Sequence, residues 1–216
     1  MAADSTQQKI LDSAERLFGE YGIGATSLRS IIADADVNIA AIHYHFGSKD
    51  ELVREVFGRR INEVNEVRLS NLQVLREKYS GSSVPVEELF RAFLAPAVAL
   101  TRDESRGGLS FARLVARAHA ETDAAVQAVL FSELKTVLEQ YLGELEKSAP
   151  HLTLNERRMR MLFAAGAMVQ TMLLPLRPDF MEHFFEGDLS QESMIENLVR
   201  FCTVGMESGS LNEAGR

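Results

Sequence analysis

Residues 28–46 read LRSIIADADVNIAAIHYHF, and this stretch predicts two short helices separated by a tight turn. Ile31 and Ile32 lie on the inner face of the first helix, and Ile42 lies on the inner face of the second. Asp36 falls at the break between them. Aspartate is one of the few residues besides glycine that adopt a left-handed backbone, so we expect Asp36 to make the turn. This layout is that of a helix-turn-helix unit.

The segments on either side of this unit also predict helices. A first helix is expected from a Ser5 cap to Gly22, and a long one from a Ser48 cap to about residue 79. Five more are expected beyond residue 80, the last two being separated by a phenylalanine-rich loop that begins at Pro175. The sequence therefore predicts an all-α chain of about nine helices, in which residues up to 47 form a compact three-helix unit.

Composition limits the possible classes of protein. The 216 residues are 46% apolar and 25% charged, as in ordinary soluble globular proteins. A single cysteine, Cys202, allows neither an internal disulfide nor a cysteine-based zinc site and favours a cytoplasmic location. We expect no signal peptide, and the apolar stretch 161–174 is shorter than a membrane span requires. The net charge is −8, and residues 1–60 contain seven basic and nine acidic residues, so any contact with nucleic acid must come from local geometry.

Residues from about 8 to 57 resemble the DNA-binding domain of the tetracycline-repressor (TetR) family of transcriptional regulators. From residue 10 onward they read ILDSAERLFGEYGIGATSLRSIIADADVNIAAIHYHFGSKDELVREVF. The resemblance is carried by the Tyr-His-Phe run at 44–46, by the Ser-Lys-acid-acid-Leu start of the next helix, and by the Gly-x-x-x-Thr-Ser spacing at 22–27. It implies an all-α protein with a DNA-binding domain over residues 1–48 and a ligand-binding and dimerisation domain over residues 49–216, with the helix over 49–79 as the connector.

The resemblance also implies which residues contact DNA. A phosphate suits the free amides and positive dipole at the starts of the helices, and nearby polar or basic side chains add to this. The expected phosphate contacts are Thr26, Ser27, Arg29, Tyr44, His45 and Lys49. Base edges would be read by the exposed positions of the helix that follows the turn, which are Asn38, Ile39, Ala40, Ala41 and His43.

Two of these expectations have alternatives. Asn38 can serve only as a helix cap, and Lys49 can be an ordinary solvated lysine. Members of the family often carry lysine and glycine where Ile39 and Ala40 stand, which leaves the operator sequence open. His43 and His45 are two positions apart in a helix and point in different directions, so we expect no metal site there.

The second half of the chain is rich in large apolar side chains, which favours a ligand pocket between helices. Methionine and phenylalanine suit an apolar ligand of irregular shape. The expected pocket residues are Phe90, Phe93, Phe111, Arg113, Arg117, Phe131, Met168 and Met172. The alternatives are ordinary core packing for the apolar residues and a solvated face for the two arginines.

The last two helices are expected to form a homodimer, because both are amphipathic and FAAGAMVQTMLL at 163–174 contains small residues that permit close packing. A two-fold dimer implies a palindromic double-stranded DNA operator. The sequence thus predicts a dimeric repressor that a small apolar or amphipathic effector releases from its operator, with no cofactor, metal or membrane partner. The alternatives are a helical protein-binding module that does not touch DNA, and an enzyme, although the common catalytic motifs are missing from the sequence.

Overall fold

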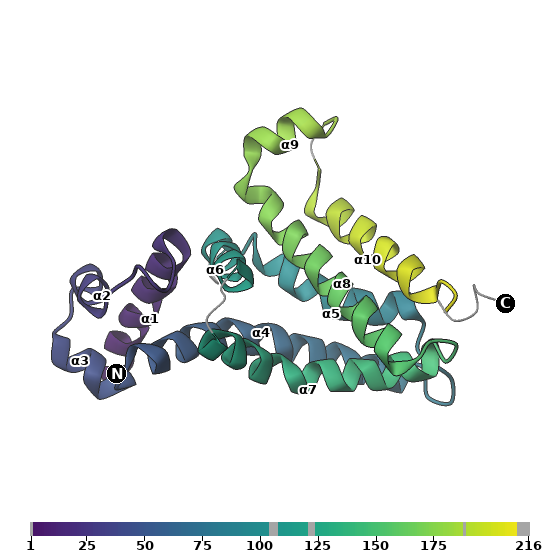
Figure 1. Ribbon diagram of the computed structural model, residues 1–216, viewed down its shortest axis with the longest axis horizontal. Helices are drawn as coiled ribbons and strands as arrows, with labels where there is room; N and C mark the ends of the chain where they lie inside the picture. Colours follow the sequence, from purple (N-terminus) through teal and green to yellow (C-terminus); the bar gives the residue numbers. More distant parts are fainter. Residues whose placement is uncertain (1, 104–107, 121–123, 188, 211–216) are drawn as a thin grey trace.

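The computed structural model describes residues 2–103, 108–120, 124–187 and 189–210, and within those ranges it contains helices and no strand (Figure 1). The all-α prediction is therefore confirmed. The helices are α1 (Ala2–Tyr21), α2 (Leu28–Ala35), α3 (Ile39–Phe46), α4 (Lys49–Lys78), α5 (Val86–Leu100), α6 (Gly108–Ala120), α7 (Ala124–Ser148), α8 (Leu154–Leu173), the 3-10 helix η2 (Leu174–Leu176), α9 (Pro178–Phe184) and α10 (Gln191–Glu207).

Helices α1, α2 and α3 form one end of the molecule, at the left of Figure 1. The turn between α2 and α3 is made by Asp36 at φ 51° and ψ 53°, which confirms the predicted left-handed residue. Gly22, at φ 88°, follows the last residue of α1 as expected. The start of α1 was predicted wrongly: the helix begins at Ala2 rather than after Ser5, because nothing in the first residues opposes helical continuation.

The core of this end draws on helices beyond the three. Phe18 of α1, Ile31 of α2 and Ile42 of α3 are buried against Leu52 of the first turn of α4, and Leu114 of α6 completes the cluster. Helix α4 then continues for 30 residues and joins this core to the second one. Since α6 belongs to the second half of the chain, the N-terminal helices are held from two sides.

The second core lies between α4, α5, α7, α8 and α10. Phe90 and Phe93 of α5 are fully enclosed, as are Leu72 of α4 and Tyr141 of α7. Helix α7 lies beside α4, and α5 packs on α10. Ser148 also ties the end of α7 to the start of α5, because its hydroxyl donates to Val84 O at 2.6 Å.

Helix α9 stands away from both cores, at the top of Figure 1. The sequence had predicted a loop there, and this prediction was wrong. Pro178 occupies the first position of the helix, where its missing N–H costs nothing, so proline marked a helix start. Phe180, Phe184 and Phe185 form an aromatic cluster on and after α9, with the rings of Phe180 and Phe184 stacked at 4.9 Å.

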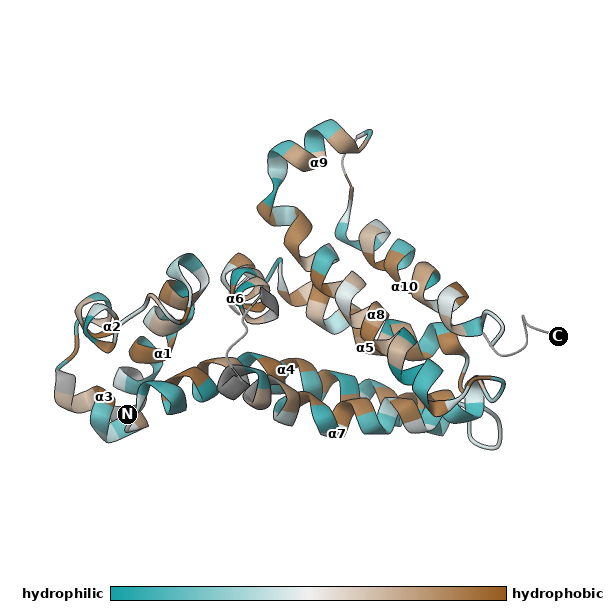
Figure 2. Ribbon diagram, viewed as in Figure 1, coloured by the Kyte–Doolittle hydropathy of each residue, from teal (hydrophilic) through white to brown (hydrophobic). Residues whose placement is uncertain are grey.

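Helix α8 and the residues after it carry an exposed apolar surface. Among the described residues, Leu154–Leu176 is the one helical segment long and apolar enough to cross a membrane, and 22% of its most apolar window is buried. This segment is longer than the apolar stretch expected from the sequence. Length and composition alone are weak evidence for a membrane span, since the core helix of a soluble protein can share both. Figure 2 shows the apolar character of α5 and α8. Exposed apolar side chains lie on α8 and also on α10: Leu162, Phe163, Phe201 and Val204 are each more than 60% exposed.

Candidate nucleic-acid interface

Helix α3 presents one face to solvent and buries the other. Ile42 and Phe46 are buried in the N-terminal core, whereas Ala40 and His43 are exposed and Tyr44 is 83% exposed. The rings of Tyr44 and His45 meet edge to face at 5.1 Å, so the half-buried His45 supports the Tyr44 ring. Ala41 is half-buried against the N-terminal core, which leaves it less accessible than Ala40.

The start of α3 is capped by Asn38. Its side-chain oxygen accepts a hydrogen bond from Ala40 N at 2.9 Å. The oxygen is therefore used locally, as the cap alternative expected, while the residue itself remains exposed. The side chain of Ile39 lies outside the described part of the chain.

Two of the three residues expected to contact DNA near the start of α2 are exposed. Ser27 is exposed and caps the helix by accepting from Ser30 N at 3.1 Å, and Arg29 projects into solvent. Thr26 differs, because it is 3% exposed and its hydroxyl donates to Gly22 O at 2.8 Å and to Leu17 O at 3.2 Å. The side chain of Thr26 is thus turned inward and holds the loop after α1.

Lys49 lies at the first position of α4, after the Ser48 cap whose hydroxyl accepts from Glu51 N at 3.2 Å. The ammonium group is half-buried and donates to Ile23 O at 2.6 Å. Lys49 therefore joins the start of α4 to the loop after α1. This bond uses one of the three donors of the ammonium group. The sequence did not predict it, because sequence spacing does not show that Ile23 lies opposite.

A buried ion cluster fixes α1 on α4. The Glu15 side chain is 3% exposed and accepts from Arg60 Nε at 3.0 Å and from Arg59. Arg59 also pairs with the exposed Asp12 at 2.7 Å. Helix α4 thus holds α1 by charge as well as by packing. Sequence reasoning missed this cluster, although Glu15 next to the apolar Ala14 was a signal for it.

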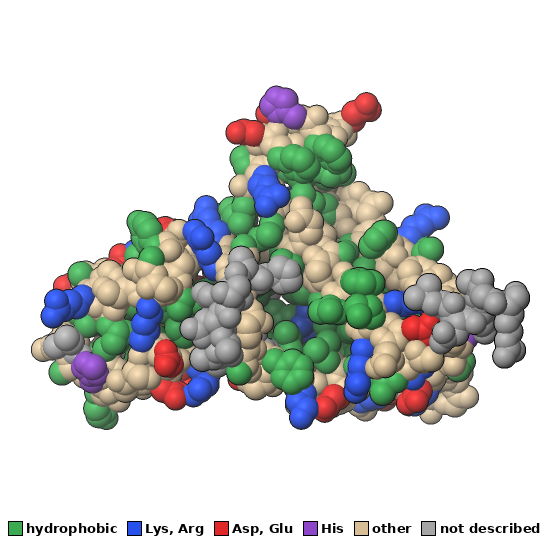
Figure 3. All heavy atoms as spheres, in the orientation of Figure 1, with side chains coloured by type: hydrophobic (Ala, Val, Ile, Leu, Met, Phe, Trp, Pro, Cys, Tyr) green, Lys and Arg blue, Asp and Glu red, His purple; other side chains and the backbone are tan. Residues whose placement is uncertain are grey.

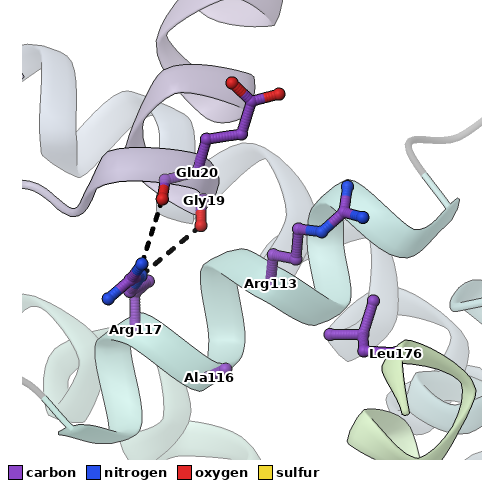
Figure 4. A pocket seen from close by; sticks show the side chains of 6 residues that line it. All are labelled: Gly19, Glu20, Arg113, Ala116, Arg117 and Leu176. Atoms are coloured by element: carbon purple, nitrogen blue, oxygen red, sulfur yellow. Dashed lines mark hydrogen bonds between the residues drawn. The ribbon is translucent and has the colours of Figure 1, made fainter. Parts of the chain in front are cut away.

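The expected ligand-pocket residues are only partly brought together. Phe90, Phe93, Phe111 and Met172 belong to the second core, and Met168 packs against it. Phe131 is 63% exposed on α7 and points away from that core. Arg113 and Arg117 line a separate cleft between α6 and the end of α1 (Figure 4).

Sequence reasoning also missed Arg68, a cation inside the second core. Its Nε donates to Phe93 O at 2.7 Å, its Nη1 donates to Asn65 Oδ1 at 3.2 Å, and the guanidinium lies 4.0 Å from the Phe93 ring centre. No carboxylate of the described residues pairs with it, and burial lowers the pKa of Arg68 to about 10. A signal was present, since Arg68 falls one helical turn from the apolar Val64 and Leu72.

The exposed face of α3, its tight turn and its supporting helices define a helix-turn-helix protein of the kind that binds DNA. Residues 10–56 match the profile described as bacterial regulatory proteins, tetR family, and residues 91–205 match the tetracyclin repressor-like C-terminal domain. The second match alone covers more than half of the chain. The chain belongs to the tetracycline-repressor family of transcriptional regulators.

Individual relatives agree with this assignment. The regulator AcrR of Shigella flexneri is 37% identical over 83 residues, which is 35% of this chain and 39% of that protein, so the match spans less than half of the relative. The repressor AcnR of Corynebacterium glutamicum is 29% identical over 170 residues, covering 70% of this chain and 88% of that protein. A solved regulator from Aquifex aeolicus has a TM-score of 0.56 and 20% identity over 92% of this chain and 98% of that one, which shows the shared fold alone.

Proposed function

We propose that the protein is a homodimeric repressor that binds a palindromic DNA operator and leaves it when a small molecule binds the C-terminal helices. The observation that carries the DNA-binding part is the two-sided character of α3. Its inner residues Ile42 and Phe46 fix the helix to the core, and its outer residues Ala40, His43 and Tyr44 are free to enter a major groove.

The proposed phosphate contacts come from three helix positions around this face. Ser27 and Arg29 would grip one strand, Tyr44 and His45 the other, and Lys49 would act from the start of α4, where the helix dipole also favours an anion. The side chain of Thr26 is left out because it is buried. Base reading would fall to the exposed positions Ala40 and His43, with Ala41, Asn38 and Ile39 beside them.

Dimerisation through α8 and α10 would explain their exposed apolar surface. Leu162 and Phe163 on α8, and Phe201 and Val204 on α10, are each more than 60% exposed in the single chain. Scattered exposed apolar residues are normal, but a patch shared by two adjacent helices marks an interaction site. A symmetric partner would cover this patch and place the two copies of α3 about 34–36 Å apart.

The proposed effector pocket lies in the second core, around Phe90, Phe93 and Met168. Arg68 gives this apolar region a cation, whose partners among the described residues are neutral acceptors and an aromatic ring. An effector with an apolar body and one hydrogen-bond acceptor would suit this combination. Displacement of Met168, a flexible side chain whose sulfur lies 3.4 Å from Arg68 Nη2, would make room for it.

Fluorescence anisotropy with DNA from the region upstream of the gene, against scrambled DNA and over a salt series, tests the proposal. We expect binding that prefers the upstream DNA at physiological salt and weakens steeply as salt rises. Weak binding that is equal on both DNAs, together with no site recovered in a genome-wide selection, would favour the protein-binding alternative instead.

A further inference from the structure

A cleft of about 450 Å³ opens between the end of α1, the middle of α6 and the 3-10 helix η2 (Figure 4). It is lined by Gly19, Glu20, Arg113, Ala116, Arg117 and Leu176. Its volume falls within the range of small-molecule sites. It lies where the N-terminal helices meet the C-terminal part of the chain, apart from the pocket proposed above.

Arg117 uses its guanidinium to cap the end of α1. Its Nη2 donates to Glu20 O at 3.0 Å and its Nε donates to Gly19 O at 3.5 Å, as the dashed lines of Figure 4 show. These carbonyls belong to the last turn of α1, where a helix has no partner of its own for them. A side chain of α6 therefore satisfies the end of a helix in the DNA-binding unit.

Arg113 lies one helical turn before Arg117 and makes no hydrogen bond or ion pair with the described residues, although it is exposed. Its Cβ lies close to α1, since a Cβ built on Gly19 would come within 3.2 Å of it. The one carboxylate at the cleft, that of Glu20, pairs with Arg16 at 3.3 Å and points away from Arg117 in Figure 4. Among the described residues, the cleft therefore holds two guanidinium groups with no acidic partner.

We propose that this cleft binds the carboxylate of an amphipathic small molecule, with the apolar part against Leu176 and Ala116. The Arg113 side chain, which points away from Arg117 in Figure 4, would turn to meet the carboxylate beside Arg117. Guanidinium groups pair with carboxylates through strong, often bidentate hydrogen bonds. A bound carboxylate would compete with the α1 carbonyl oxygens for Arg117. Ligand binding would then remove the cap from α1.

This competition links the cleft to α3, the helix proposed to enter the major groove. Leu114 and Ala118, on the same helix as the two arginines, are buried in the N-terminal core beside α1. Loosening α1 from α6 would therefore shift the core on which α3 rests. We expect carboxylate binding to lower operator affinity, a consequence that rests on the proposed operator binding.

Isothermal titration calorimetry with 4-phenylbutyrate and 4-phenyl-1-butanol tests the site, because the two probes differ chiefly in charge. We expect the acid to bind at least tenfold more tightly than the alcohol, and Arg113→Gln and Arg117→Gln each to weaken the acid at least tenfold. Arg113→Gln is the cleaner variant, since Arg113 has no hydrogen bond or ion pair with the described residues to lose. Thermal melts show whether Arg117→Gln still folds.

One further variant serves as a control. Arg102→Gln removes an exposed arginine that also donates to a backbone carbonyl, Leu189 O at 3.5 Å, and should leave binding unchanged. Equal binding of acid and alcohol, no binding of the acid, or an equal loss with Arg102→Gln and Arg113→Gln would overturn the proposal.

Operator affinity with and without 4-phenylbutyrate gives the second readout. The acid should weaken the wild-type protein on its operator at least fivefold and leave Arg113→Gln unaffected. An unchanged wild-type affinity at saturating acid would overturn the regulatory role. A wild-type protein that binds no DNA at all would instead remove the proposed function, and the calorimetry would still decide the site.

Discussion

Glu15 is the residue on which the attachment of α1 to α4 depends most. Its carboxylate is the buried partner of both Arg59 and Arg60, whose side chains are 15% and 10% exposed. Glu15→Ala leaves two largely buried cations short of a counter-charge. We expect a loss of about 3 kcal/mol in the free energy of unfolding, measured by urea denaturation followed by circular dichroism.

The matched control is Asp12→Ala, which removes another carboxylate that pairs with Arg59. The Asp12 side chain is 56% exposed, so solvent already screens its charge. We expect a loss below about 1 kcal/mol. Similar losses in the two variants would show that burial does not decide the strength of this cluster.

Tyr44 allows a test of DNA contact that leaves the fold intact. The side chain is 83% exposed and no described residue bonds to its hydroxyl. Tyr44→Phe should therefore keep the melting temperature and raise the operator Kd about fivefold, the effect of one lost hydrogen bond of about 1 kcal/mol. Anisotropy titrations measure the change.

Tyr21→Phe is the control for this variant. Tyr21 is 62% exposed as well, but it is the last residue of α1 and lies outside α3. Its Kd should equal that of the wild-type protein. A Tyr44→Phe variant that also binds like wild type would remove Tyr44 from the proposed phosphate contacts.

The angle between α2 and α3 is set by the left-handed backbone at Asp36. Asp36→Gly should be at least as stable as wild type, because glycine adopts φ 51° without strain. Asp36→Val should lose about 1–2 kcal/mol and bind operator more weakly, since a β-branched residue opposes this conformation and would reorient α3. Thermal melts and anisotropy on both variants measure the effect. A stable Asp36→Val variant with unchanged affinity would contradict it.

Elements with local signals were predictable from the sequence. The Ser48 cap is confirmed, because a cap depends only on residues three positions apart. Helix α9 was missed because clustered prolines and phenylalanines favour a loop by composition, whereas Pro178 starts a helix by position.

The candidate site was less predictable than the fold. Its details depend on tertiary neighbours. Thr26 is turned inward toward Leu17, Lys49 donates to Ile23, and Arg117 caps the end of α1. A sequence pattern indicates which residue types lie near a helix end. It does not show which carbonyl lies opposite them.

At the scale of the whole molecule, the exposed apolar surface of α8 and α10 is the proposed dimer interface. Figure 3 shows hydrophobic side chains gathered around α9 and along this side of the molecule. Phe201→Glu places a charge on a side chain that is 71% exposed in the single chain. We expect it to yield a folded monomer in light scattering after size-exclusion chromatography, with operator affinity reduced at least tenfold because only one half-site is held.

Val74→Glu is the control for this variant, because Val74 is 59% exposed but lies on α4, outside the α8 and α10 surface. It should keep the wild-type mass. If Phe201→Glu keeps that mass as well, the proposed dimer interface is wrong.

The unbroken length of α4 has a mechanical consequence. A helix of 30 residues is about 45 Å long. Pivoted at its far end, such a rod swings its near end by about 4 Å for a tilt of about 5°, which exceeds the rise of about 3.4 Å per base pair. Because the ion cluster of Glu15 fastens α1 to the N-terminal part of α4, helices α1 to α3 would move together with α4. A rearrangement at the C-terminal end of α4 that tilts the helix by about 5° would therefore move its N-terminal end by about the spacing of one base pair.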